Sequence, residues 1–401
     1  FNLLLFLSSF YFLIKSFFKH NYILISSISL LLILFFWGPK PYYWSGFYDI
    51  FVLDKVLPYP STFAISLTFL TLSLVNINHD HTSYSRSVLI ILLSAIVFIT
   101  HPTTAIFLFI GVISLTFTFN NFSLKQCILR SGIIIIPSLT LCLFWPYYNI
   151  PELFSGNTHD FHNDSKSLYN YVFRKCWPII LATPGLFYFR RDKILDFLLL
   201  SLILTIILYT VGFCFKIYGL SRLISNSMML AHILIAYIVI RSVKDYNLFS
   251  KLYLPVLVIS MLASVYLNRF SLVDTINVFR DSSINYYMKY DFLRSIIDTD
   301  ELILSDSNTN WFIPSFNGKV ISSVHPLYWV KDLDERRDAV HSFFAKESSD
   351  SLRQVIIQKY NPDYILINYS EVDFNDTSLK WLDNIGKSIY MNDQLELIEL
   401  K

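Results

Sequence analysis

Apolar segments, each about as long as a lipid bilayer is thick, follow one another through the first 268 residues of the chain. An α-helix needs roughly 20 apolar residues to cross the hydrocarbon core of a membrane. These segments therefore predict an α-helical polytopic membrane domain over residues 1–268, with about ten transmembrane helices. They lie at about 1–14, 22–37, 60–77, 84–100, 103–119, 131–149, 168–189, 194–213, 223–240 and 252–267.

The pattern changes after residue 268, where short β-like runs begin to alternate with amphipathic helical stretches. Strands that alternate with helices are typical of an α/β domain. We expect a linking helix at 269–300 and a small soluble α/β domain at 301–401. The predicted strands are 301–306, 319–324, 363–368 and 395–400, and the predicted helices are 334–345 and 348–360.

The composition restricts the class of protein. Hydrophobic residues make up 54% of the chain and charged residues only 15%, whereas soluble domains carry about 25% charged residues. A net charge of +2 is too small to indicate a nucleic-acid partner. The four cysteines match no zinc-binding spacing, and apolar filler in or near helices is their simplest interpretation.

The distribution of Lys and Arg predicts how the chain is oriented, because cytoplasmic loops are enriched in both. The clearest signal is the basic turn RRDK at 190–193, which we place on the cytoplasmic side. This orientation makes the protein a multi-pass integral membrane protein with an extracytoplasmic C-terminal domain. Since the chain begins with Phe1 and is apolar from the start, we expect it to lack its natural beginning.

Four residues on the predicted outer face are candidates for chemistry. Asp49 and Asp54 lie in an aromatic-rich loop and could act as a general base, although carboxylates are common in solvated loops. Arg222 begins a span and could bind a phosphate, or its side chain could only reach the membrane interface. His101, before Pro102, is a predicted hairpin tip that could bind a phosphate or stabilise the turn.

A second polar loop, at 150–167, contains residues with the chemistry of metal ligands. Asp160 and His162 are the candidates for a divalent metal, which is the only cofactor that the sequence suggests. Their spacing matches no named motif, so an ordinary polar loop is the alternative.

The order of several passages resembles that of the polytopic glycosyltransferases of the GT-C superfamily, in its mannosyltransferase-like group. The resemblance rests on LPYPSTFAISLTFLTLSL (57–74), THPTTAIF (100–107), YGLSRLISNSMMLAHILIAYIV (218–239), and the α/β passages at 304–344 and 352–368. The resemblance covers most of residues 57–370.

The resemblance implies transfer of a sugar from a polyprenyl-phosphate-linked donor to a glycan, lipid or protein acceptor on the extracytoplasmic face. The catalytic carboxylate of such enzymes usually lies in the first outer loop, which we expect upstream of residue 1. A lipid-linked-sugar transporter or flippase is an alternative, but it predicts inverted repeats and paired mid-span charges, which the sequence does not show convincingly. A non-catalytic membrane scaffold is the third possibility.

Overall fold

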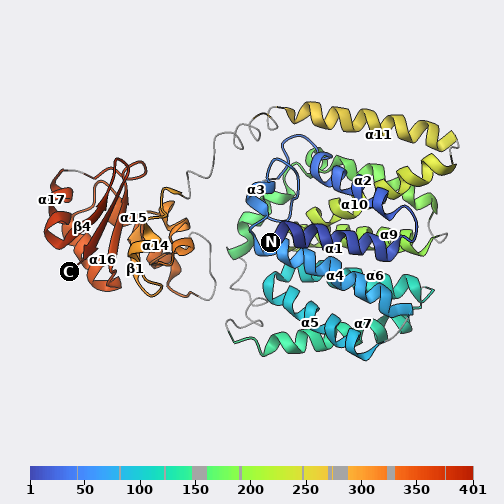
Figure 1. Ribbon diagram of the computed structural model, residues 1–401, viewed down its shortest axis with the longest axis horizontal. Helices are drawn as coiled ribbons and strands as arrows, with labels where there is room; N and C mark the ends of the chain where they lie inside the picture. Colours follow the sequence, from blue (N-terminus) through green and yellow to red (C-terminus); the bar gives the residue numbers. More distant parts are fainter. Residues whose placement is uncertain are drawn as a thin grey trace. The chain divides into compact units, whose positions relative to one another are not determined.

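The chain folds into two compact units, residues Phe1–Ile276 and Asn277–Lys401, in a computed structural model (Figure 1). The structure describes all residues except 43, 81–82, 122, 147–159, 189–191, 246–247, 270–272, 274–287, 323–329, 375 and 401. Most of the predicted linking helix at 269–300 lies outside the described residues. We call the two parts the helical unit and the C-terminal unit.

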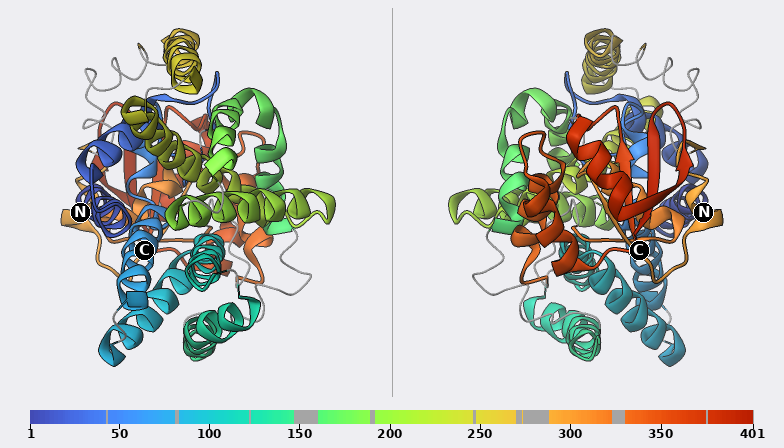
Figure 2. Two further views of the ribbon diagram at one scale, coloured as in Figure 1. Left: turned by 90° about the vertical axis from the view of Figure 1, so that its right-hand side faces the viewer. Right: turned by 90° about the vertical axis from the view of Figure 1, so that its left-hand side faces the viewer.

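The helical unit consists of helices that mostly run alongside one another, and a quarter-turn of the view shows several of them nearly end-on (Figures 1 and 2). Its elements are α1 (Asn2–Phe17), α2 (Tyr22–Phe35), α3 (Leu53–Val56), α4 (Pro60–Asp80), α5 (Tyr84–Thr100), α6 (Pro102–Phe119), α7 (Leu124–Leu143), η3 (Asp160–Tyr169), α8 (Val172–Lys175), η4 (Trp177–Tyr188), α9 (Lys193–Cys214), η5 (Tyr218–Arg222), α10 (Leu223–Asp245) and α11 (Leu248–Leu267).

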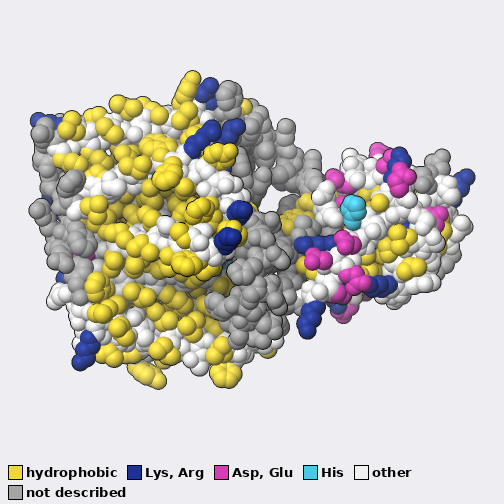
Figure 3. All heavy atoms as spheres, turned by 180° about the vertical axis from the view of Figure 1, so that it is seen from behind, with side chains coloured by type: hydrophobic (Ala, Val, Ile, Leu, Met, Phe, Trp, Pro, Cys, Tyr) yellow, Lys and Arg dark blue, Asp and Glu magenta, His cyan; other side chains and the backbone are white. Residues whose placement is uncertain are grey.

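The helical unit makes the chain an integral membrane protein. Among the described residues, five helical stretches are long and apolar enough to cross a membrane: Pro60–Ile77, Pro102–Phe119, Leu124–Leu143, Lys193–Cys214 and Tyr218–Lys244. Five shorter apolar helices accompany them, so a total of ten spans stays a prediction. Hydrophobic side chains cover most of the visible surface of this unit, whereas charges of both signs are scattered over the C-terminal unit (Figure 3).

The seventh predicted segment, 168–189, differs from the expected single α-helix. It is divided among the end of η3, the short helix α8 and the 3-10 helix η4. Pro178 and Pro184 both lack the backbone N–H that an α-helix needs, and Tyr171 adopts a left-handed conformation with a φ of 57°. These residues prevent a continuous α-helix.

Helix α10 lies at the centre of the helical unit and α7 at its edge. Of the apolar window in Tyr218–Lys244, 83% is buried inside the unit, compared with 22% for that in Leu124–Leu143. Helix α10 packs against α2, α6, α9, η4 and α11. Residues at the start of α10 are therefore surrounded by other elements, while α7 exposes its apolar side chains.

Buried hydroxyl groups in α4 are satisfied within the helix itself. Ser66, Thr68, Thr71 and Ser73 each donate a hydrogen bond to the backbone carbonyl four residues earlier, over 2.7–2.9 Å. An unpaired hydroxyl would be costly in an apolar interior. This internal pairing lets α4 pack closely against α1, α5 and α6 without polar partners on those helices.

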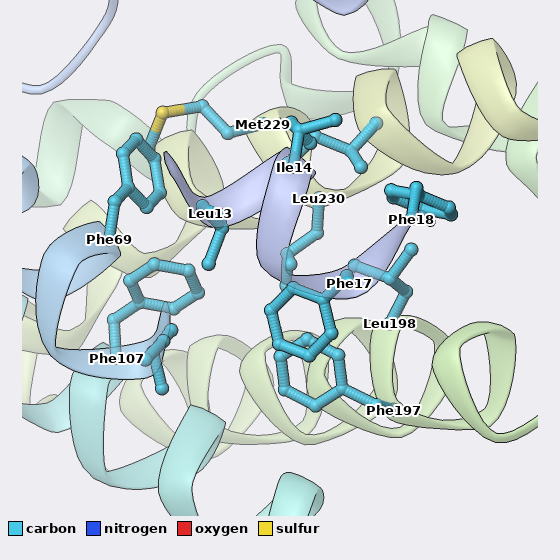
Figure 4. A pocket seen from close by; sticks show the side chains of 12 residues that line it. Leu13, Ile14, Phe17, Phe18, Phe69, Phe107, Phe197, Leu198, Met229 and Leu230 are labelled. Atoms are coloured by element: carbon cyan, nitrogen blue, oxygen red, sulfur yellow. The ribbon is translucent and has the colours of Figure 1, made fainter. Parts of the chain in front are cut away.

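An apolar cavity of about 20 Å³ lies where α1, α4, α6, α9 and α10 meet (Figure 4). The rings of Phe17 and Phe197 stack beside it with centroids 4.8 Å apart, and Phe69 and Phe107 form another wall. Its described lining is entirely apolar, so it offers a water molecule no hydrogen-bond partners. We interpret the cavity as a small packing gap.

The C-terminal unit confirms the predicted small α/β domain. Its five-stranded sheet has the order β2-β1-β3-β5-β4, in which β1 is parallel to β2 and β3, and β5 is antiparallel to β3 and β4. Its elements are α14 (Leu293–Ile296), β1 (Leu302–Ser305), η6 (Thr309–Trp311), η7 (Ile313–Phe316), β2 (Lys319–Val320), α15 (Leu333–Phe344), α16 (Asp350–Tyr360), β3 (Tyr364–Asn368), α17 (Asp376–Ile385), β4 (Gly386–Met391) and β5 (Leu395–Leu400).

Strand β3 is buried on both faces, which gives the unit its layers. Ile365 and Ile367 join the apolar cluster that contains Val340 of α15 and Ile356 of α16. Tyr364 and Leu366 join a second cluster on the opposite face, with residues of α14 and η7. A strand of continuous apolar character is expected where both faces are covered.

An irregular segment between α2 and α3, residues 36–52, is attached to the helices by polar side chains. Asn268 accepts a hydrogen bond from the backbone N–H of Lys40 and donates one to the carbonyl of Gly38. His232 of α10 donates from Nε2 to the carbonyl of Phe36 over 2.9 Å. Backbone groups outside regular helices need such partners in an apolar environment.

The Asn268→Ala variant tests this attachment. It should lower the free energy of unfolding by about 2 kcal/mol, because the backbone groups of Gly38 and Lys40 lose their partner. Thermal unfolding of the purified protein measures the loss. The Leu267→Ala variant is the control, since Leu267 is 52% exposed. Equal effects of the two substitutions would contradict the proposed attachment.

Candidate functional site

A small polar cavity brings together residues from four parts of the helical unit. These parts are the irregular segment 36–52, α4, the turn between α5 and α6, and the residues from Arg222 to the start of α10. The volume of the cavity is about 10 Å³. The lining residues are Ser45, Gly46, Tyr48, Ser61, Ile65, His101, Thr103, Thr104, Arg222, Ser225 and Asn226. We call this cavity the arginine pocket.

His101 is the turn between α5 and α6. It ends α5 with an extended backbone, and Pro102 follows as the first residue of α6. Its Nδ1 lies 2.7 Å from Oγ1 of Thr104 and 3.3 Å from the backbone nitrogen of the same residue. These contacts fix the ring at the N-terminus of α6, where the helix dipole favours negative charge.

Arg222 lies against His101, although 121 residues separate them in the sequence. Its Nη1 is 3.2 Å from Nε2 of His101. A guanidinium only donates hydrogen bonds, so this contact needs an unprotonated Nε2, whereas Nδ1 accepts the backbone N–H of Thr104 in the cap of α6. The two contacts therefore favour different tautomers of the neutral imidazole.

The guanidinium of Arg222 has an unused hydrogen-bond donor. Its Nε is buried and has no hydrogen-bond partner among the described residues. Its Cζ lies 5.5 Å from the centre of the Trp44 ring, within range of a cation–π contact. No carboxylate of the described residues forms an ion pair with it, and no Asp or Glu lines the pocket there. A partly buried cation without a counter-charge is costly.

Gly46 lets the irregular segment approach the start of α10. Its φ is +94°, a conformation that other residues rarely adopt. A Cβ atom at this position would lie 3.2 Å from Oγ of Ser225. The close approach places Trp44 and Tyr48 beside Arg222.

The two carboxylates predicted as bases have different positions. Asp49 is fully buried, and the arginine pocket is lined by the neighbouring Tyr48 instead. Oδ1 of Asp49 accepts the backbone N–H of Phe51 over 2.8 Å, and Oδ2 has no partner among the described residues. Asp54 belongs to α3, and its side chain lies outside what the structure describes.

The predicted metal ligands cannot be placed. Asp160 and His162 belong to the 3-10 helix η3, but their side chains lie outside what the structure describes. Among the residues that are described, no three His, Cys, Asp or Glu side chains gather as a metal site would require. The divalent metal therefore stays a prediction.

The sequence analysis did not single out Trp44, Tyr48, Ser225 or Asn226 as parts of a site. Ser225 and Asn226 follow Arg222 by three and four residues, which is the spacing of neighbours on one helix face. Trp44 and Tyr48 belong to the aromatic-rich loop noted above. Their approach to Arg222 depends on how residues 36–52 fold, which local sequence does not reveal.

The comparisons with known proteins give a remote structural likeness. No family model and no curated protein match the chain. The structure is similar to the crystal structure of the Archaeoglobus fulgidus oligosaccharyltransferase tethered with an acceptor peptide, with a TM-score of 0.47 and 11% identity. The match covers 90% of this chain and 56% of that chain. At this similarity, we base no conclusion about fold or function on it.

Burial of Asp49 makes the stability of the fold depend on pH. It raises the pKa of this carboxyl to about 7, while the backbone N–H groups of Phe51 and Val52 act in the opposite direction. The unfolded chain loses this proton near pH 4, so the folded state loses stability as the pH rises from about 4 to about 7. Above pH 7 the contribution is constant.

The Asp49→Asn variant should remove this dependence, since an amide keeps the acceptor for Phe51 and does not titrate. Relative to the variant, the natural protein should lose about 3 kcal/mol of stability between pH 5 and pH 8. Melting temperatures of both proteins over this range measure the difference. A difference that does not change with pH would show that the carboxyl of Asp49 titrates normally.

Proposed function

We propose that the protein is an integral membrane glycosyltransferase that takes a sugar from a polyprenyl-phosphate-linked donor. The observation that carries the proposal is the guanidinium of Arg222, which lies against His101 without a carboxylate partner among the described residues. This arrangement favours an anionic ligand, and the phosphate of a lipid is an anion available in a membrane. The acceptor would be a glycan, lipid or protein.

The hydrogen-bond donors of the pocket suit a phosphate oxygen, and the cavity of about 10 Å³ would have to open to admit the whole group. Guanidinium binds phosphate oxygens through two parallel hydrogen bonds, and the unused Nε of Arg222 supplies one of the donors. The N-terminus of α6 adds a favourable dipole at His101. A phosphate oxygen placed between the two side chains would accept hydrogen bonds from both, once His101 carries a proton on Nε2.

The same groups would assist the transfer reaction. When the bond between sugar and phosphate breaks, negative charge grows on the phosphate oxygen that leaves. Hydrogen-bond donors fixed in position toward this oxygen stabilise the transition state more than they stabilise the bound sugar-phosphate substrate. Arg222 would supply permanent charge, and His101 would supply a proton or a hydrogen bond.

The general base that activates the acceptor is not assigned. Asp49 and Asp54 remain candidates from the sequence, but Asp49 does not line the arginine pocket. A transporter of lipid-linked sugars would also need a phosphate site, so turnover rather than binding separates the two functions.

The Arg222→Gln variant should lower kcat/KM for transfer from a radiolabelled polyprenyl-phosphate sugar by about 100-fold. This corresponds to the loss of a charge-assisted hydrogen bond worth up to about 3 kcal/mol. The His101→Ala variant should also lose activity. The measurement uses full-length protein in lipid nanodiscs with a panel of candidate donors and acceptors.

The Lys216→Gln variant is the matched control. Lys216 is an exposed cation shortly before η5, and it does not line the pocket. It should keep full activity. Unchanged turnover in Arg222→Gln would remove the arginine pocket from the mechanism, and flux of intact donor across the membrane without transfer would favour a transporter.

A further inference from the structure

A second pocket, of about 230 Å³, lies in the C-terminal unit where the parallel strands β1 and β3 end. Its described lining comes from the loop after β1, the loop after β3 and the end of α15. The lining residues are Asp306, Ser307, Asn308, Val340, His341, Phe344, Ala345, Glu371 and Val372. In open α/β sheets, the crevice beyond the carboxyl ends of the strands is the usual place for a ligand.

Asp306 gives this pocket an unsatisfied acceptor. The side chain is only 7% exposed, and Oδ1 accepts the backbone N–H groups of Asn308 and Thr309 over 2.9 and 3.0 Å. Oδ2 is buried and has no hydrogen-bond partner among the described residues. A buried carboxylate oxygen without a donor costs stability. Oδ2 of Asp306 therefore lacks a hydrogen-bond donor, which a ligand could supply.

The opposite wall of the pocket carries a second carboxylate, that of Glu371, which a hydrogen bond holds in place. Asn308 donates from Nδ2 to Oε2 of Glu371 over 2.7 Å, which joins the two loops across the pocket. Burial lowers the pKa of the Lys289 ammonium, and the negative charges of Glu371 and Asp306 partly oppose this. Two carboxylates in the lining outnumber the one lysine near them, and the excess negative charge disfavours phosphates and other anions.

The other lining residues indicate which class of uncharged or cationic ligand suits the pocket. The described residues offer no triad of side chains for a metal ion. Val340, Phe344 and Val372 add an apolar surface to the acceptors. An apolar surface beside oxygen acceptors suits a ring that has C–H groups on its faces and hydroxyl groups at its edge.

We propose that this pocket binds a single pyranose sugar, whose hydroxyl groups donate to Asp306 and Glu371. The volume suits one ring rather than a chain of rings. The inference rests on the C-terminal unit alone, so it holds or fails independently of the arginine pocket.

The test uses full-length protein in lipid nanodiscs that contain no glycoside detergent. The probes are the methyl pyranosides of glucose, galactose, mannose and N-acetylglucosamine, observed by saturation-transfer NMR. At least one of them should bind, and Glu371→Gln and Asp306→Asn should each weaken its binding at least 10-fold. The amide in Asp306→Asn can still accept from Asn308 and Thr309, so the loop is retained.

The matched control is Asp334→Asn, which removes one carboxylate from the first turn of α15. The side chain of Asp334 is 95% exposed and does not line the pocket. The Asp334→Asn variant should bind the sugar as well as the natural protein does. The proposal would be overturned if none of the four sugars binds, or if binding is unchanged in both pocket variants. It would also be overturned if only calcium ions, added as calcium chloride, bind to the natural protein and this binding is lost in the pocket variants. Binding that is lost in Arg222→Gln but kept in Glu371→Gln would place the sugar in the helical unit and would also overturn it.

Discussion

The hydrogen bonds between the irregular segment 36–52 and the helices around it are the constraint on which the helical unit depends. Buried backbone groups have no water to pair with, so a buried non-helical segment must find its partners within the protein. His232 and Asn268 supply partners to Phe36, Gly38 and Lys40. The segment held in this way presents Trp44 and Tyr48 to the start of α10.

The contact between Arg222 and His101 is the chemical consequence of that packing. Two side chains that both carry or accept protons lie 3.2 Å apart, at the N-terminus of α6 and near the start of α10. The contact is favourable only while Nε2 is unprotonated, because a proton there would present N–H to the guanidinium. An anion between the two side chains would make protonation favourable, which links ligand binding to the proton on His101.

Much of the fold could be predicted from the sequence, because apolar length and strand periodicity are local signals. The turn at His101-Pro102 was predictable for the same reason, since both residues act on the backbone next to them. The prediction of one α-helix over the seventh segment, 168–189, was wrong, because apolar composition does not distinguish an α-helix from a 3-10 helix. Strand β4 was missed, since its partly exposed residues lack a continuous apolar pattern.

The site was less predictable, because it depends on contacts between residues far apart in the chain. Arg222 and His101 each suggested a phosphate ligand from their own chemistry, but their contact follows from the packing of α6 against α9, η5 and α10. The burial of Asp49 is also a tertiary effect, since its loop is rich in residues that could equally face solvent. The roles of all these residues stay predictions.

Native mass spectrometry of the protein with a polyprenyl monophosphate tests the central claim most directly, because it records binding of the phosphate without any acceptor or sugar. The natural protein and Lys216→Gln should each retain one lipid molecule, and Arg222→Gln should retain none at the same concentration. Equal retention by all three proteins would contradict the account, since it would show that Arg222 does not hold the phosphate.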